Sequence, residues 1–211
     1  MMVTRLKLAG AAIASIAFLA AAPGAALAGK CSSGEAKATG KKASCKGSVF
    51  SKAAAKNLPA DPAKLQKCED KFSASFAKAQ SAGDCTSGVT AGAEETKVDN
   101  FVNDLNTELA VGPLPSKCQA AKLKAGGKKA SCKLGVHAKG LAKNLAPDPV
   151  KLQACTDKFS AAFAKAETGT TCGTSANATT IENKVDAFVA DIVDDVNPPP
   201  TTTTLLPACP G

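Results

Sequence analysis

The heptapeptide GKKASCK occurs twice in this chain of 211 residues, at 40–46 and at 127–133. The same offset of 87 residues aligns four cysteines of one half with four of the other without a gap, and the steps between them are 14, 23 and 17 residues in both halves. This regularity predicts two tandem units of one fold. The aligned sets are Cys31, Cys45, Cys68 and Cys85, and Cys118, Cys132, Cys155 and Cys172.

The sequence of each unit predicts three helices. The first is rich in Ala and Lys and is expected over 35–56, and the second begins at Asp61 and Pro62, which suit the N-cap and the first helical position. Apolar residues then recur every three or four positions, which places them on one helix face. These stripes are Leu65, Cys68, Phe72, Phe76 and Ala79 in the second helix, Val98, Phe101, Val102, Leu105 and Leu109 in the third, and Ile181, Val185, Phe188, Val189, Ile192 and Val196 in the last helix of the second unit.

No stretch of the sequence alternates apolar and polar residues with a period of two, so we predict no sheet. The expected fold is all-α, with two tandem three-helix units. Each unit is an antiparallel helical hairpin stapled by two disulfides, to which a third amphipathic helix is added.

The cysteine steps predict which cysteines pair. Cys31 and Cys45 would lie about 21 Å apart on one helix, too far for a disulfide. An antiparallel hairpin that turns at 57–60 instead brings Cys45 opposite Cys68 and Cys31 opposite Cys85. The predicted nested bridges are Cys45 to Cys68, Cys31 to Cys85, Cys132 to Cys155 and Cys118 to Cys172.

A crossed pairing remains an alternative at this point. It needs a break in the first helix, and Gly40 in the first unit, with Gly126 and Gly127 in the second, would permit one. Either pairing serves the same purpose, because a unit of roughly 80 residues buries barely enough apolar surface to offset its chain entropy. Each bridge is expected to add about 3 to 4 kcal/mol.

The N-terminus resembles a secretory signal. Arg5 and Lys7 precede an apolar run at 8–22, and Ala26-Leu27-Ala28 forms a small-residue cleavage site, so cleavage is expected after Ala28. Its removal lowers the formal net charge from +8 to +6. We therefore expect a secreted or periplasmic protein that is not an integral membrane protein. The expected segments are a signal peptide at 1–28, unit 1 at 29–112, unit 2 at 113–197 and a disordered Pro/Thr-rich tail at 198–211.

The nine cysteines of an exported chain favour a disulfide framework in an oxidising compartment. Eight of them belong to the two units, and the ninth, Cys209, lies in the tail. An odd cysteine predicts an intermolecular bridge, a free thiol or a partner outside this sequence.

Catalytic and cofactor chemistry finds little support in the sequence. His137 is the only histidine, and the matched position in unit 1 is Phe50, which favours a packed helix position over a catalytic base. C-x-x-C motifs and phosphate-binding glycine loops are both absent from the sequence. We therefore predict no catalytic residue, no cofactor and no metal site, and a non-enzymatic protein. A hydrolase that uses His137 is the remotest alternative.

Charge is divided between the helices of each unit. Residues 31–57 hold six lysines and one acid, Glu35, and residues 118–144 hold seven lysines and no acid, whereas the third helices are acidic. Lysine without arginine or aromatic partners favours diffuse, salt-sensitive attraction to anions over specific nucleic-acid recognition. The predicted anion-binding face comprises Lys41, Lys42, Lys46, Lys128, Lys129 and Lys133.

Two other interpretations of this charge pattern are open. Charge runs usually form a solvated helix face, so the lysines would keep an Ala-rich helix soluble and pair loosely with acids of the same unit. The basic helices could also pair with acidic helices of other molecules, in a cell-envelope protein that self-assembles with the help of Cys209. The function predicted first is a secreted structural or binding module that contacts an anionic polysaccharide or cell surface.

Two stretches, DKFSAAFAKAE at 157–167 and IENKVDAFVADIV at 181–193, carry a resemblance together with the spaced cysteines. The chain resembles an uncharacterised group of exported bacterial repeat proteins with Ala/Lys-rich, four-cysteine helical units and Thr/Pro-rich spacers. Unit 1 departs from this pattern in the loop after Cys85. The resemblance implies export and repetition, and it implies no mechanism.

Overall fold

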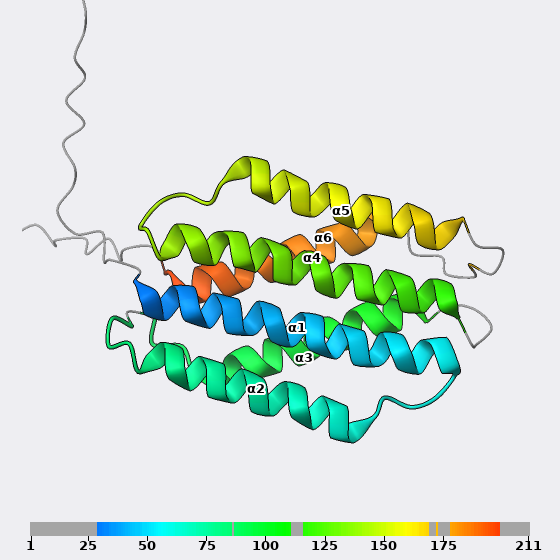
Figure 1. The fold of residues 1–211 in the computed structure, drawn as a ribbon, viewed down its shortest axis with the longest axis horizontal. Coiled ribbons are helices and arrows are strands. Elements are labelled where there is room, and N and C mark those ends of the chain that lie inside the picture. Colours follow the sequence, from blue (N-terminus) through cyan, green and yellow to red (C-terminus); the bar gives the residue numbers. More distant parts are fainter. Residues whose placement is uncertain (1–28, 86, 111–115, 169–171, 173–177, 199–211) are drawn as a thin grey trace, which may run out of the picture.

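The computed structural model describes residues 29–85, 87–110, 116–168, 172 and 178–198, and these residues contain helices and no strand (Figure 1). The predicted all-α fold is therefore confirmed. The predicted signal peptide, Cys209 and nearly all of the predicted tail lie outside the described residues. The helices are α1 (Lys30–Lys56), α2 (Pro62–Gln80), α3 (Ala91–Leu109), α4 (Lys117–Leu141), α5 (Pro149–Glu167) and α6 (Ala178–Val196).

Local sequence sets the start of α2 and α5. The side chain of Asp61 accepts a hydrogen bond from the backbone N–H of Lys64, and Asp148 accepts from the backbone N–H of Lys151 in the same way. Each aspartate is followed by a proline, whose missing N–H would have no partner in the first turn. Both starts agree with the prediction for the second helix of a unit.

A distant side chain sets the start of α1. The helix begins at Lys30, earlier than the start predicted at Glu35. The carboxylate of Asp84, in the loop after α2, accepts hydrogen bonds from the backbone N–H groups of Lys30 and Cys31 at 2.7 and 2.8 Å. These N–H groups have no partner inside the helix, so this carboxylate satisfies them and extends α1 by more than a turn.

All four predicted disulfides are present as nested pairs, and the crossed alternative is wrong. The inner bonds are Cys45–Cys68 and Cys132–Cys155, and the outer bonds are Cys31–Cys85 and Cys118–Cys172. The glycines that could have broken the first helix of each unit lie instead inside continuous helices.

These glycines bring α1 and α4 together. The two helices run antiparallel and side by side at the centre of the molecule, with α2 and α5 outside them (Figure 1). A Cβ atom at Gly40 would lie 3.0 Å from the Cβ of Leu134, and one at Gly127 would lie 3.1 Å from the carbonyl oxygen of Ala43. Only glycine permits this separation of the two backbones without a shift.

One hydrophobic core runs through both units. It includes the stripes of α3 and α6 together with residues of α1, α4 and α5. In this core the rings of Phe101 of α3 and Phe188 of α6 stack with 4.1 Å between their centroids. Because the core is continuous, residues 29–112 and 113–197 stabilise each other.

The contacts between the two units are reciprocal. Lys97 of α3 forms ion pairs with Asp191 and Asp195 of α6, and Lys184 of α6 forms ion pairs with Asp104 and Glu108 of α3. Each of these residues has its counterpart 87 positions away, and Phe101 stacks on its own counterpart. These contacts between α3 and α6 therefore join matched positions of the two units, as contacts do across an isologous interface.

Candidate functional site

Lys42 and Lys46 do not face solvent, so this part of the predicted anion-binding face is wrong. Lys42 is only 2 % exposed and forms ion pairs with Glu69, Glu95 and Asp99. Lys46 is also buried and pairs with Glu69 and Asp99. These acids come from α2 and α3, which fold over this face of α1. The lysines that the sequence predicts to be solvated thus hold three helices of unit 1 together.

The matched lysines of unit 2 behave similarly. The buried Lys129 pairs with Glu182 at 2.6 Å and with Asp186 at 3.0 Å, while the half-buried Lys133 pairs with Asp186 at 2.7 Å. The Nζ atom of Lys129 also lies over the ring of Phe159, 5.1 Å from its centroid. The interpretation that lysines pair with acids of their own unit applies here, although the pairs are buried instead of loose.

The third carboxylate of the unit 1 cluster makes it electrostatically unlike that of unit 2. Burial alone would raise the pKa of Glu69, but hydrogen bonds with Glu95, Lys42 and Lys46 lower it to about 2. The hydrogen bond with Glu69, followed by burial, raises the pKa of Glu95. Burial alone would lower the pKa of Lys46, but hydrogen bonds and charge interactions with Asp99 and Glu69 outweigh it and raise this pKa. The cluster therefore favours an ionised Glu69 beside a more readily protonated Glu95.

Lys41 and Lys128 are the two members of the predicted face that are exposed. They occupy matched positions, and each lines a cleft between the first two helices of its unit. The cleft at Lys41 has a volume of about 310 Å³ and also contains Lys71 and Phe72. The cleft at Lys128 has a volume of about 380 Å³.

A larger basic cleft of about 460 Å³ lies where α1, α4 and α5 meet. Its rim carries Lys37 of α1, Lys139 of α4, and Lys151 and Lys158 of α5, and its floor includes Val136 and the inner disulfide of unit 2. The part of the lining that the structure describes contains no carboxylate, although Lys151 pairs with Asp148 nearby. We name this the lysine cleft. Lys158 also lines the cleft of Lys128, so the two clefts are neighbours.

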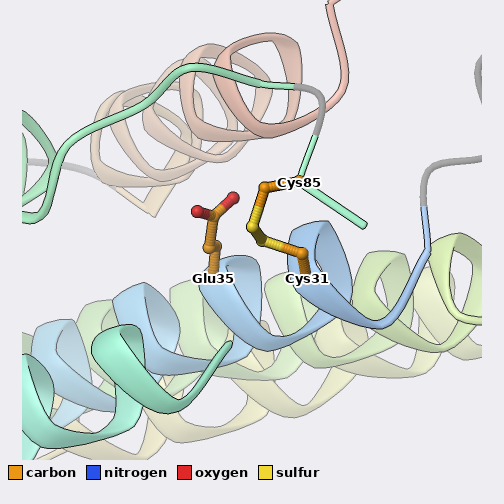
Figure 2. Close-up of side chains that lie close together, drawn as sticks. All are labelled: Cys31, Glu35 and Cys85. Carbon is orange, nitrogen blue, oxygen red and sulfur yellow. A yellow bond between two sulfur atoms is a disulfide. The ribbon is translucent and has the colours of Figure 1, made fainter. Parts of the chain in front are cut away.

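A second site lies at the outer disulfide of unit 1, where Cys31 and Glu35 stand one turn apart on α1 and Cys85 reaches them from the loop after α2 (Figure 2). The two sulfur atoms and a carboxylate oxygen of Glu35 all lie within 4.8 Å of one another. Cys31 and Glu35 are fully buried, whereas Cys85 is exposed.

Glu35 is an unusual residue for the interior. One oxygen, Oε2, accepts a hydrogen bond from the hydroxyl of Ser87 at 3.1 Å, while Oε1 is buried and accepts none from the described residues. Burial raises the pKa of Glu35, and the polar side chains of Ser87 and Gln80 oppose this shift only in part. A buried acceptor without a partner is unfavourable and often marks a functional position.

Glu94 is a second buried carboxyl group of unit 1. It lies in the first turn of α3 and accepts a hydrogen bond from the hydroxyl of Thr39 at 3.3 Å. Burial, followed by the proximity of Asp195 in α6, raises its pKa to about 8. Glu94 is thus a titratable group at the contact between the two units.

His137 is half-buried on α4 and lines a cleft of about 280 Å³ with Leu141, Asn144 and Val193, among others. Burial lowers its pKa, and the charge of Lys133 lowers it further. This environment keeps the imidazole neutral at ordinary pH and supplies it with an apolar neighbourhood. It corresponds to the packed position that Phe50 predicts.

Sequence reasoning missed both the lysine cleft and the roles of Glu35 and Glu94. The cleft combines residues of both units, so its lysines are not neighbours in sequence. Glu35 did carry a signal, because it is the only acid in a lysine-rich helix and follows Cys31 by four positions, which places both on one face.

Comparison with known protein families, with curated proteins and with solved structures finds no match to this chain. Among the helices that the structure describes, none combines the length and apolarity needed to cross a membrane. The four disulfides indicate an oxidising environment such as exported proteins meet.

Proposed function

We propose that this chain is an exported, non-enzymatic binding module that holds anionic polymers or surfaces by charge at the lysine cleft. The observation that carries the proposal is the cleft itself, in which four lysines from three helices surround one depression and no carboxylate is found among its described lining residues. Lysine ammonium groups on flexible stems attract anions without demanding a fixed geometry. The expected ligand is therefore a polyanion recognised by charge density.

The distribution of acids supports this choice. The acidic helices α3 and α6 lie behind α1 and α4 in Figure 1, and their acids already pair with Lys97 and Lys184 within the chain. An uneven charge distribution orients a protein toward an anionic partner during its approach. Because these acids of α3 and α6 already pair with lysines of the same chain, they favour an anionic partner over pairing of basic and acidic helices between molecules.

Export is part of the same proposal. Cleavage of a signal peptide after Ala28 would leave Gly29 as the N-terminal residue, directly before α1. Intact mass measurement of the protein secreted from its natural host tests this step. A mature chain that still carries residues 1–28 would contradict it.

The binding test uses the disulfide-intact mature chain on immobilised dextran sulfate and on vesicles that contain phosphatidylglycerol. We expect retention on one or both matrices at low ionic strength and elution as salt is raised, since salt screens exposed charges over about 10 Å at 0.1 M. Lys37→Gln/Lys139→Gln/Lys158→Gln should elute at a clearly lower salt concentration than the parent.

The matched control is Lys56→Gln/Lys78→Gln/Lys117→Gln, which removes three exposed lysines outside the lysine cleft and leaves the same net charge. Equal elution of the two triple variants would show that net charge alone accounts for retention, and it would refute the cleft. Absence of retention at low salt would refute anion binding altogether. If oligomers formed through Cys209 and disappeared in Cys209→Ser, self-assembly would become the better proposal.

A further inference from the structure

The outer disulfide of unit 1, together with Glu35, supplies the ligand types of a metal site, but its two sulfurs are bonded to each other. Two cysteine sulfurs and a carboxylate oxygen within 4.8 Å of one another form a ligand set that suits Zn²⁺, provided that both sulfurs are thiolates. We propose that Cys31, Cys85 and Glu35 form a redox-gated site for a thiophilic divalent cation such as Zn²⁺, which opens when a dithiol reduces the Cys31–Cys85 bond (Figure 2). This site is separate from the lysine cleft.

Glu35 supplies the observation that distinguishes this disulfide from a plain staple. Its carboxyl group is fully buried, and its Oε1 atom accepts no hydrogen bond among the described residues. A cation bound to the two sulfurs would lie within reach of the Glu35 carboxyl group, to which it would supply a partner. Because the hydroxyl of Ser87 already holds Oε2, the carboxyl group is oriented before any ion arrives.

The exposure of Cys85 makes this bond the most accessible of the four. Cys85 is exposed, whereas the more accessible cysteine of each other bond, which is Cys45, Cys132 or Cys172, is only half-buried. Thiol–disulfide exchange requires in-line access of a thiolate to one sulfur. A reductant therefore reaches Cys85 first, and the inner bond of unit 1 remains to hold the hairpin.

The chemistry of opening is balanced by one dithiol. One thiolate of the dithiol attacks the Sγ of Cys85, the Cys31–Cys85 bond breaks, and Cys31 leaves as a thiolate. The second thiol of the reductant, as a thiolate, then attacks the reductant sulfur of the mixed disulfide and releases Cys85. The reductant is oxidised to a cyclic disulfide, the protein gains two electrons and two protons, and Zn²⁺ later displaces the thiol protons.

Noncovalent contacts keep the ligands together after reduction. Asp84, next to Cys85, accepts hydrogen bonds from the backbone N–H groups of Lys30 and Cys31 at 2.7 and 2.8 Å. On the other side of the loop, the side-chain amide of Gln80 donates to the carbonyl oxygen of Val89 at 2.9 Å. The contacts of Asp84 tie the loop to α1, and the contact of Gln80 ties it to the end of α2. Both are independent of the disulfide, so the three ligands remain near one another.

Unit 2 contains a natural control. Its outer bond, Cys118–Cys172, has Lys122 at the position that matches Glu35. Lys122 is buried and pairs with Glu167 at 2.8 Å. An ammonium group offers a cation no acceptor and repels it, so reduction of this bond should create no comparable site.

The experiment uses the mature chain with Cys209→Ser, treated with limiting dithiothreitol under an inert atmosphere. Differential alkylation and mass spectrometry should show that Cys31 and Cys85 are released before the other six cysteines. Titration with Zn²⁺, and with Cd²⁺ for its thiolate charge-transfer absorption, should then show one bound ion per chain. The disulfide-intact protein should bind no ion with comparable affinity.

Three variants in the same background assign the site. Cys31→Ser/Cys85→Ser should abolish binding, and Glu35→Gln, which keeps the shape of the side chain, should weaken it by at least about tenfold. Glu35→Lys, which copies unit 2, should abolish it. Glu94→Gln removes a buried carboxyl group elsewhere in unit 1 and should leave the affinity unchanged.

Several results would overturn the inference. One is release of Cys118 and Cys172, or of an inner bond, before Cys31 and Cys85. Others are a reduced chain that binds no ion, and an affinity that does not change in Glu35→Gln, which would indicate adventitious coordination by thiols alone. Circular dichroism of the reduced protein accompanies each titration, and ion binding by an unfolded chain counts against a site built by the fold.

Discussion

Units 1 and 2 share a frame, which is their order of helices and their disulfides, and they differ in some of their interior side chains. The nested disulfides and the buried Lys42 and Lys129 occur at matched positions in both. Unit 1 places three carboxyl groups in or near its interior where unit 2 has none. The three matched pairs are Glu35 and Lys122, Glu69 and Thr156, and Glu94 and Ile181.

This difference teaches that the frame tolerates a wide range of interior chemistry once the disulfides and buried lysines are in place. The position of Glu35 in unit 1 is occupied by the oppositely charged Lys122 in unit 2. Lys122 pairs with Glu167, whose counterpart in unit 1 is the neutral Gln80. Unit 1 is therefore the half in which pH and redox state should act. Unit 2 is closer to a unit whose interior has only a structural role.

The largest expected effect is the loss of a buried lysine. Lys42→Ala leaves Glu95 without its lysine and leaves Glu69 and Asp99 with Lys46 alone, and we expect it to lower the free energy of unfolding by about 3 to 5 kcal/mol. Lys129→Ala leaves Glu182 without its lysine and Asp186 with Lys133 alone, so it affects two carboxylates instead of three and should cost less. Urea denaturation of the mature chain measures both.

Two further variants separate charge from packing in that test. Lys42→Met keeps most of the apolar stem and removes the Nζ atom, which lies over the ring of Phe72, so the loss that remains is electrostatic. Lys41→Ala, on the exposed face of the same helix, should change stability by less than about 0.5 kcal/mol. Equal losses for Lys42→Ala and Lys129→Ala would remove the proposed role of the third carboxylate.

Next in size is the pH dependence that Glu94 confers. Its pKa in the folded protein is about 8, against an ordinary value of 4.5, so between these values the folded protein retains a proton that the unfolded chain has released. Stability should therefore fall as pH rises through this window, by about 1.4 kcal/mol per pH unit at most, and level off above about pH 8. Glu94→Gln should flatten this slope in thermal unfolding.

Replacing Glu94 by the residue at the matched position of unit 2 gives a more specific test of this pH dependence. Glu94→Ile copies unit 2 and should give the same flat profile from pH 4.5 to 8, whereas Glu108→Gln, on the same helix, should retain the slope. A parent protein whose stability does not fall across this range would contradict the assigned burial of Glu94.

A smaller effect is expected at the contact between α1 and α4, where the units are not equivalent. A Cβ at Gly40 would lie 3.0 Å from the Cβ of Leu134 and 3.2 Å from the backbone at Ser131, so Gly40→Ala should cost about 1 to 3 kcal/mol. At Gly47, the counterpart of Leu134, an added Cβ would come no closer than 3.5 Å to α4. Gly47→Ala should therefore be neutral or stabilising, by up to about 1 kcal/mol. Chemical denaturation distinguishes the two, and equal losses would show that the helices do not approach as described.

The smallest effect concerns the reciprocal ion pairs. Lys97→Ala and Lys184→Ala each break partly exposed pairs with two acids of the other unit, and each should lower stability by about 1 kcal/mol or less. The two losses should be similar and should shrink at high salt. A large difference between them, measured in the same denaturation series, would show that the contact between the units is less reciprocal than the geometry indicates.

The sequence predicts those parts of the structure that depend on spacing along one helix. The stripe that contains Phe72 and Phe76 is buried, Asp61 caps α2, and the cysteine steps give the right disulfides. Helical geometry alone determines each of these features, because residues three or four positions apart share a face.

The burial of the lysines could not be predicted in this way. Periodicity places Lys42 and Lys46 on one face of α1, but it does not say what covers that face. The covering acid Asp99 lies 53 residues from Lys46. The lysine cleft has the same origin, since it forms only when α1 of one unit packs against α4 and α5 of the other. Such features depend on tertiary packing between helices, and single-sequence patterns carry no information on it.

The reciprocal contact between the units has a consequence for assembly. Two separate copies of such a unit would have to meet in solution, and their association would weaken on dilution. Here the last residue of α3 and the first of α4 are Leu109 and Lys117, so a short connection holds the two surfaces at an effective concentration on the order of millimolar. The pairing of α1 with α4, and the cleft that it creates, should therefore persist at any protein concentration that a cell exterior provides.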